Sequence, residues 1–388
     1  MVARYHTKAC MMDRNGVIMG KQLLHTPEGV RDVYGTEYEK KLKVQNLLHN
    51  KIALYGYEDI QTPSFEFFDV FGSDIGTTPS RELYKFFDKE GNTLALRPDF
   101  TPSIARCAAK YFMDKNEPLR FSYLGNAFTN VSNLQGKLKE TTQMGVELIG
   151  DASVYADAEV LSVAIEALLN AGLTDFMVSV GNAEYFKGLC EEFLFSVEME
   201  SIVHEYISNK NFFGAQEYLL NENVDKSVRD KLLKTGELVG SVEVLDTAVK
   251  LANNSRSKDA IKRLVDLYKV LQQYGIEQYV SFDLGMLTQY QYYTGMIFKA
   301  YTYGVGDAIV KGGRYDALLS QFGKKASAIG FVILIDDLML ALTRQSIAVC
   351  LDEPKKILTY TESNFTEVLK EAKALREQGV AVEMRKEG

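Results

Sequence analysis

The segment Arg120–Gly150 constrains the fold of this chain more than any other stretch. Its sequence, RFSYLGNAFTNVSNLQGKLKETTQMGVELIG, has alternating apolar residues along 121–128, a polar loop at 129–139 and a second apolar run. This pattern predicts a strand, a loop and a return strand. Gln143 and Glu147 lie four residues apart on the return strand, so both side chains would point to the same face of a sheet.

The composition is that of an ordinary globular protein. The chain has 388 residues, of which 46% are hydrophobic and 25% charged, which is enough for a full core and two or three structural units. No apolar run reaches transmembrane length, and no signal-peptide core follows the N-terminus. Residues 1–20 show no clear period, and we expect them to form a flexible extension.

The net charge and the cysteine content limit the kinds of binding partner and the cellular compartment that we expect for this chain. The net charge of −8 disfavours a nucleic-acid binder, because neutralising phosphates requires clustered Lys and Arg. The four cysteines include no CxxC pair, and the four histidines show no ligand spacing. We therefore expect no disulfide framework, no metal site, and a reducing cytoplasm as the compartment.

The N-terminal half outside this segment alternates helix and strand. Helical spacing of apolar residues predicts a helix over 36–55 that is closed by Gly56. A short strand follows in EDIQTPSFEFF and is interrupted at Pro63. Residues 151–172 then read as an amphipathic helix, and 176–180 as a strand.

The C-terminal half begins with a charged helical block at 185–275. Strands are expected at 277–287, in YYTGMIFKAYTYG and in AIVKGGRYDALL, and 327–342 begins as a strand and ends as a helix. Residues 354–388 read as a short β-α-β unit. We expect Gly312–Asp316 to have a structural role, with Arg314 and Asp316 as a local ion pair.

In their order, these segments resemble the class II aminoacyl-tRNA synthetases, and the histidyl enzyme in particular. Arg120–Gly150 is similar to motif 2, the helix, YGY turn and strand running into TP are similar to motif 1, and SAIGFVILIDDLMLAL is similar to motif 3. TPEGVRDVYG and LRPDFTPSIAR also resemble segments of the histidyl enzyme. The resemblance implies an α+β fold with an antiparallel sheet flanked by helices, and dimerisation through motif 1.

The resemblance also implies a division of the chain into units. Residues 21–184 and 276–345 would form the synthetase-like core, and 185–275 a helical insertion. Residues 354–388 resemble the beginning of an anticodon-binding domain and are too few for the whole of it.

Three positions depart from what an adenylate-forming synthetase requires. The family places phosphate-binding arginines in motif 2, in an RGLDYYTG-like segment and at the end of motif 3, whereas this chain has Thr129, Thr288 and Asp337 there. Threonine cannot supply a bidentate cation, and a carboxylate repels a triphosphate. We therefore expect no efficient aminoacyl-adenylate formation.

The amino-acid side of the implied site is retained. The resemblance assigns contacts with the substrate α-amino group and imidazole to six positions, namely Asp99, Thr101, Gln143, Glu147, Tyr292 and Tyr293. Carboxylates and aromatic rings suit a small zwitterion with a weakly basic ring such as histidine. Simpler interpretations are that Glu147 only pairs with Arg106 or Arg120, and that the tyrosines only pack the sheet.

A synthetase-like fold without these arginines resembles the regulatory subunits of short-form ATP phosphoribosyltransferase. The resemblance implies a non-catalytic protein without a cofactor, which joins a short catalytic subunit in a hetero-octamer, activates it and helps to convey feedback inhibition by histidine. Alternatives are a divergent histidyl-tRNA synthetase, a tRNA-sensing module, and a homodimeric scaffold with an empty pocket. The acidic charge and the short C-terminal unit disfavour the tRNA-sensing alternative.

Overall fold

The structure is a computed structural model, and it describes residues 24–72, 78–131, 137–286, 293–351 and 355–387. Three sequence predictions fall outside these residues. They concern the N-terminal extension, Thr288 and Tyr292.

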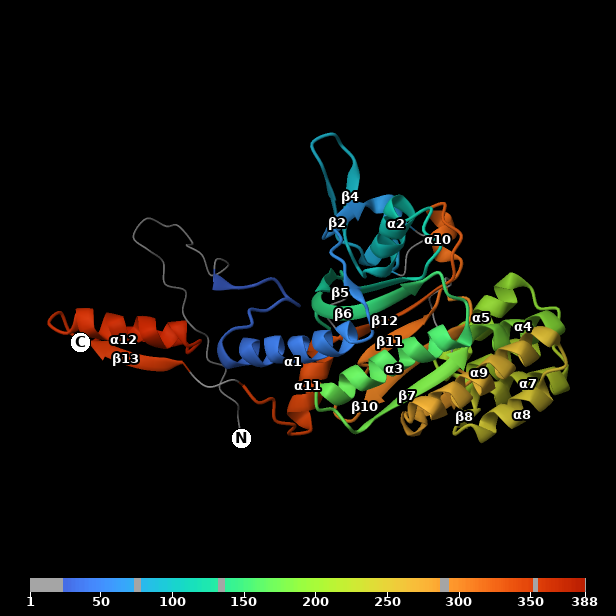
Figure 1. Ribbon diagram of the computed structural model, residues 1–388. Helices are drawn as coiled ribbons and strands as arrows, with labels where there is room; N and C mark the ends of the chain where they lie inside the picture. The colour runs from blue at the N-terminus through green and yellow to red at the C-terminus, as the bar shows by residue number, and fades with distance from the viewer. Residues whose placement is uncertain (1–23, 73–77, 132–136, 287–292, 352–354, 388) are drawn as a thin grey trace, which may run out of the picture.

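A nine-stranded sheet forms the centre of the molecule (Figure 1). Its strands lie in the order β1 (Glu58–Asp59), β5 (Leu119–Phe128), β6 (Glu140–Ile149), β12 (Ala328–Leu334), β11 (Val310–Arg314), β10 (Met296–Thr302), β7 (Phe176–Asn182), β9 (Val280–Asp283) and β8 (Val239–Gly240). Among the six strands from β5 to β7 in this order, each adjacent pair is antiparallel. The pairs β1–β5 and β7–β9 are parallel. The prediction of an α+β fold with a largely antiparallel sheet is confirmed.

Strands β5 and β6 form the hairpin that the sequence predicted. They pair in register from Leu119 opposite Ile149 to Phe128 opposite Glu140. Even-numbered residues of β6 such as Val146 are buried in the main hydrophobic core, while Gln143 and Glu147 point to the other face. On β6 the alternation therefore separates the core face from the face that carries Gln143 and Glu147, called the polar face below. On β5, Phe121 and Tyr123 on that same side belong to a second hydrophobic cluster.

Helices α3 (Val154–Asn170) and α1 (Gly35–Ala53) lie beside each other over the apolar face of the sheet (Figure 1). Lys41 of α1 donates a hydrogen bond to Thr142 of β6. The side chain of Ser153 begins α3 by accepting a hydrogen bond from the backbone N–H of Ala156 at 3.3 Å. Gly56 has φ of +78° just after α1, as expected for a glycine that closes a helix. Helix α11 (Ile335–Arg344) follows β12 directly.

A second, three-stranded sheet stands above the first in Figure 1, and only its first strand was predicted. It consists of β2 (Phe65–Phe67), β4 (Thr93–Leu96) and β3 (Lys85–Phe87), with the short 3-10 helices Phe68–Phe71 and Ser80–Glu82 beside it. Helix α2 (Thr101–Tyr111) follows β4 and packs near α10 (Leu318–Gln321). β2 falls within the strand expected in EDIQTPSFEFF, after its interruption at Pro63, whereas β3 and β4 were not predicted because each has only three or four residues.

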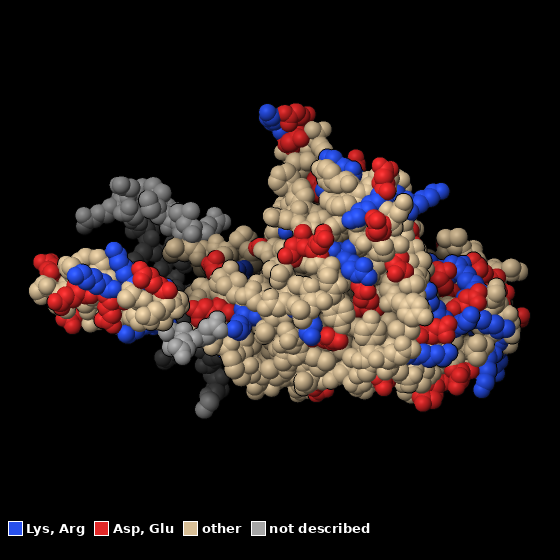
Figure 2. Space-filling model, viewed as in Figure 1, with Lys and Arg blue, Asp and Glu red and all other residues tan. Residues whose placement is uncertain are grey.

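The helical block on the side of β7 consists of α4 to α9 (Figure 1). Their bounds are α4 Ala183–Glu192, α5 Val197–Ser208, α6 Phe212–Asn221, α7 Lys226–Gly236, α8 Glu243–Leu251 and α9 Ser255–Tyr274. The strand expected at 277–287 is shorter than expected, because a 3-10 turn at Glu277–Tyr279 precedes β9. Lys and Arg alternate with Asp and Glu over the part of this block visible in Figure 2, so the described surface there has no continuous basic patch.

The C-terminal residues form a separate β-α-β unit that lies away from the main sheet (Figure 1). Strands β13 (Lys356–Tyr360) and β14 (Val382–Lys386) are parallel, and α12 (Phe365–Glu377) connects them. The order of elements matches the sequence prediction. Among the described residues, no helix combines the length and apolar character needed to span a bilayer.

Candidate functional site

A cavity of about 180 Å³ opens on the polar face of the sheet, beside the turn that precedes α2. It is much smaller than the roughly 300–1,000 Å³ typical of pockets for drug-sized ligands, which limits its occupant to a small molecule. The side chains that line it include Asp99, Thr101, Tyr123, Thr129, Gln143, Glu147, Tyr293, Lys311 and Tyr315. Five of the six predicted ligand-binding residues therefore meet in one place, and the sixth is Tyr292.

Glu147 is the most deeply buried carboxyl group of the cavity, with 1% of its surface exposed. Thr101 Oγ1 donates a hydrogen bond to its Oε1 at 2.7 Å, and the Tyr315 hydroxyl donates another to Oε2. Burial raises the pKa of Glu147 to about 8, although both hydroxyl donors favour the charged form. The side chain is therefore mostly neutral at pH 7, and a cation placed beside it would stabilise its ionised form.

Two glycines make room for these groups. A side chain at Gly330 would collide with the Glu147 carboxyl group, because the two residues are directly opposite on β12 and β6. A Cβ at Gly313 would come within 2.6 Å of the Tyr293 ring. The shape of the cavity thus depends on glycine at both positions.

Asp99 lies in the tight turn before α2. Its Oδ1 accepts a hydrogen bond from the Thr101 backbone N–H at 3.0 Å. This bond fixes the carboxyl group two residues before the start of α2. Burial raises the pKa of Asp99 to about 7, and this hydrogen bond lowers it only in part. The cavity therefore contains a second carboxyl group that a bound cation would help to ionise.

Gln143 contributes a polar atom without a partner. Only 8% of its surface is exposed, and its Oε1 accepts no hydrogen bond from any described residue. A buried amide oxygen left in this state costs about 1–3 kcal/mol. An N–H donor on a bound molecule would remove that cost.

The end of the cavity beside Thr129 and Lys311 differs in charge from the end beside Glu147. Thr129 lines it, as predicted, and supplies no charge. Asp337 lies in the first turn of α11 and is not among the lining residues, yet the nearby charges of Asp307 and Lys311 act on its carboxyl group. Burial and Asp307 together raise its pKa. Lys311 does line the cavity, and its ammonium group pairs with Asp307 at 3.0 Å.

The structure rules out the simpler interpretation of Glu147. Arg106 pairs with Glu66 at 2.8 Å, and Arg120 pairs with Glu159 at 2.8 Å. Both arginines are therefore engaged with other carboxylates. The expectation that Glu147 might be neutralised by one of them is wrong, since its described partners are two hydroxyl groups.

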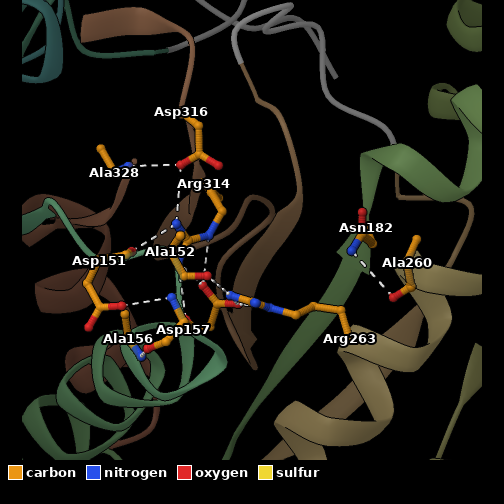
Figure 3. Close-up of polar contacts among 11 residues, drawn as sticks. Asp151, Ala152, Ala156, Asp157, Asn182, Ala260, Arg263, Arg314, Asp316 and Ala328 are labelled. Carbon is orange, nitrogen blue, oxygen red and sulfur yellow. Dashed lines mark hydrogen bonds and ion pairs between the residues drawn. The ribbon is translucent and has the colours of Figure 1, made fainter. Parts of the chain in front are cut away.

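The Gly312–Asp316 segment has the structural role expected of it (Figure 3). Arg314 pairs with Asp316 at 3.2 Å, which confirms the local ion pair, but its main partner is the buried carboxylate of Asp157 on α3, at 2.5 Å. Arg263 on α9 approaches the other oxygen of Asp157 at 2.6 Å. One carboxylate thus connects the sheet, α3 and the helical block.

Comparisons with known proteins match this chain to a histidyl-tRNA synthetase model and to ATP phosphoribosyltransferase regulatory subunits. A family model described as histidyl-tRNA synthetase matches residues 29–338. ATP phosphoribosyltransferase regulatory subunits from Acetivibrio thermocellus and Clostridium kluyveri are 39% and 37% identical, over 94% and 93% of this chain and 88% and 93% of their own lengths. The chain belongs to the family of ATP phosphoribosyltransferase regulatory subunits.

Solved structures agree with this family and with the fold. A crystal structure from Bacillus halodurans, titled as an ATP phosphoribosyltransferase regulatory subunit/histidyl-tRNA synthetase, has a TM-score of 0.87 at 32% identity and covers 94% of this chain and 93% of its own. Histidyl-tRNA synthetase from Nostoc sp. PCC 7120, at 21% identity and a TM-score of 0.80 over 94% of this chain and 86% of its own, supports the fold alone.

Sequence reasoning missed several residues of the cavity in this regulatory-subunit chain, among them Tyr315, Tyr123 and Lys311. Tyr315 was considered only as part of a structural segment, yet its hydroxyl group donates to Glu147. Tyr123 stacks on Phe100 with ring centroids 4.4 Å apart, and Lys311 lies two residues before Gly313. The period-two spacing of Lys311 and Gly313 was the available signal, because it places both on one face of the strand.

Proposed function

We propose that this chain is a non-catalytic regulatory subunit that activates a short catalytic ATP phosphoribosyltransferase subunit and conveys inhibition by histidine. One observation carries the proposal. The cavity combines carboxyl groups and tyrosines suited to an amino acid with Thr129 at the position where activation chemistry requires an arginine. The names of the relatives, which match nearly the whole chain, identify the enzyme that such a subunit would regulate.

The charge around the cavity argues against adenylate formation. Adenylyl transfer depends on several positioned cations that neutralise a triphosphate. Lys311 is the single cationic side chain among the described lining residues, and Asp307 already pairs with it. Asp337 adds a further carboxyl group near Lys311. A triphosphate would therefore meet repulsion at the end where a synthetase attracts it.

Histidine is the ligand that fits the proposal. Its ammonium or imidazole group would interact with Asp99 and Glu147, and an N–H of the ligand would satisfy Gln143 Oε1. Tyr293, together with Tyr292, would contact the ring. Because a bound cation favours ionised carboxyl groups, binding would release protons from Glu147 and Asp99, and affinity would rise as the pH increases through about 7–8.

Binding alone does not regulate an enzyme, so the ligand must distinguish two states of the complex. In the proposed assembly, two copies of this chain pair through the motif 1 segment and join catalytic subunits in a hetero-octamer in the cytoplasm. Histidine inhibits if it binds more tightly to the less active arrangement. The six residues Asp99, Thr101, Gln143, Glu147, Tyr292 and Tyr293 would set that preference.

Reconstitution tests the proposal. The purified chain would be mixed with a short catalytic subunit from the same genome, and phosphoribosyl-ATP formation followed with and without histidine. We expect activity to rise in the mixture and to fall when histidine is added. No gain in activity would exclude the proposal, and histidine-dependent ATP–pyrophosphate exchange by this chain alone would point to a synthetase instead.

A variant assigns the histidine effect to the cavity. Glu147→Ala removes the buried carboxyl group, and we expect it to abolish or strongly weaken inhibition by histidine. Glu362→Ala is the matched control, since that carboxylate is 88% exposed in the C-terminal unit and pairs only with Lys386. Inhibition that persists unchanged in Glu147→Ala would show that histidine acts elsewhere.

A further inference from the structure

The polar face of the sheet continues from Glu147 toward a pair of lysines. Glu147, Gly330 and Gly313 form one row across β6, β12 and β11. Lys311 lies two residues from Gly313, so it belongs to the next row on the same face and lines the same cavity. Strand spacing and rise place the backbones of Glu147 and Lys311 roughly 12 Å apart, with both side chains directed into the space between them.

A second lysine lies next to Lys311 on the neighbouring strand, outside the residues that line the cavity. Lys299 on β10 is directly opposite Lys311, and like charges in that arrangement destabilise a sheet. Burial lowers the pKa of Lys299, and the charge of Lys311 lowers it further. No ion pair or hydrogen bond joins the Lys299 ammonium group to the described residues, since the nearby Asp283 pairs with Lys210 at 3.2 Å.

We propose that Lys311 binds the carboxylate of the amino acid held in the cavity. The inference rests on the proposed function, because it assumes an amino-acid ligand. With its amine or ring at Glu147, such a ligand would extend its carboxylate toward Lys311. Lys299 supports this contact from the opposite strand by adding positive potential.

The groups around Lys311 favour a single carboxylate over a phosphate chain. Asp307 pairs with Lys311, and Asp337 lies close enough for its charge to interact with both. A polyanion would therefore be repelled by two carboxyl groups, whereas one carboxylate can share the Lys311 ammonium group with Asp307. Lysine has three donors and no fixed fork, so it can serve both acceptors at once.

Isothermal titration calorimetry of the full chain with L-histidine and with histamine tests whether Lys311 binds the carboxylate. Histamine has the same ring and amine but lacks the carboxylate. We expect the unmodified chain to prefer histidine, and Lys311→Met to weaken histidine binding by about 10- to 100-fold, the range for a charge-assisted hydrogen bond. Histamine binding should change less than about threefold, so the preference would disappear.

Two variants separate the carboxylate contact from other effects. Lys311→Arg keeps a cation and should retain most of the preference for histidine. Lys311→Gln removes the charge but keeps a polar side chain, and it should lose the preference if Lys311→Met fails to fold. Lys269→Met removes an exposed charge of α9 that pairs only with Asp266, and it should leave both affinities unchanged.

The outcomes distinguish this inference from the proposed function. Equal losses for histidine and histamine in Lys311→Met, or unchanged histidine affinity, would overturn the role of Lys311 while leaving the histidine site in place. An unmodified chain that binds neither molecule would overturn both the histidine site and the role of Lys311.

Discussion

Two buried carboxyl groups on opposite faces of the same sheet are stabilised in opposite ways. Asp157 and Glu147 are each 1% exposed. Asp157 lies between the guanidinium groups of Arg314 and Arg263, which together bind both of its oxygens (Figure 3). Glu147 receives hydrogen bonds only from hydroxyl groups among the described residues.

The difference separates a structural carboxylate from a binding group. Burial raises the pKa of Asp157, but two cations oppose that effect, so its interactions are complete without a ligand. The pKa of Glu147 rises to about 8 because no cation opposes burial. A neutral buried acid beside an unpartnered amide oxygen at Gln143 is a site that lacks its cation.

The largest expected effect comes from the structural carboxylate. Asp157→Asn leaves Arg314, itself 5% exposed, without its main counter-charge, and the free energy of unfolding should fall by about 3–5 kcal/mol. Urea denaturation measures the change. Asp266→Asn, at an exposed pair with Lys269, is the control and should change stability by less than about 0.5 kcal/mol. A loss below about 1 kcal/mol for Asp157→Asn would erase the contrast between the two carboxyl groups.

Glu147→Gln should not destabilise the protein as Asp157→Asn does, because it replaces a neutral acid with a neutral amide. The folded-state pKa of Glu147, about 8, lies above the unfolded value near 4.5. The contribution of Glu147 to the free energy of unfolding is therefore largest below about pH 4.5, and it is lost as the pH rises to about 8. The variant should remove this loss, which is on the order of 1 kcal/mol per pH unit in that range.

Unfolding free energies measured from pH 5 to pH 8 check the second prediction. The difference between the variant and the unmodified chain should grow in favour of the variant as the pH rises. A pH-independent difference would mean that Glu147 is already ionised in the folded state. The binding of histidine should be lost in the same variant, because an amide cannot become an anion.

The sequence was sufficient for the elements whose pattern is local. The hairpin of β5 and β6, helix α3 and the terminal β-α-β unit follow from periodicity, and the end of α1 follows from Gly56. Strands β3 and β4 of the small sheet were missed, because strands of three or four residues carry too few side chains to show a period.

For the site, sequence reasoning identified residue types but not their partners. Glu147 and Gln143 could be placed on one face from their spacing alone. Whether an arginine neutralises Glu147 depends on contacts between distant segments, such as Arg106 with Glu66 and Arg120 with Glu159. Lys311 was missed for the same reason, since only the order of strands brings it to the cavity.

The smallest expected effect concerns the hydroxyl group that holds Glu147. Thr101→Val keeps the shape of the side chain but removes the 2.7 Å hydrogen bond to Oε1, and it should cost about 1 kcal/mol of stability. Because that bond favours the ionised form, its loss should raise the pKa of Glu147 further, so the pH needed for half-maximal histidine affinity should move upward. Thr343→Val, which removes a hydroxyl bonded to a carbonyl on exposed α11, should leave that pH unchanged. If histidine affinity keeps the same pH dependence in Thr101→Val, the hydroxyl contributes only to packing, and Glu147 owes its protonation to burial alone.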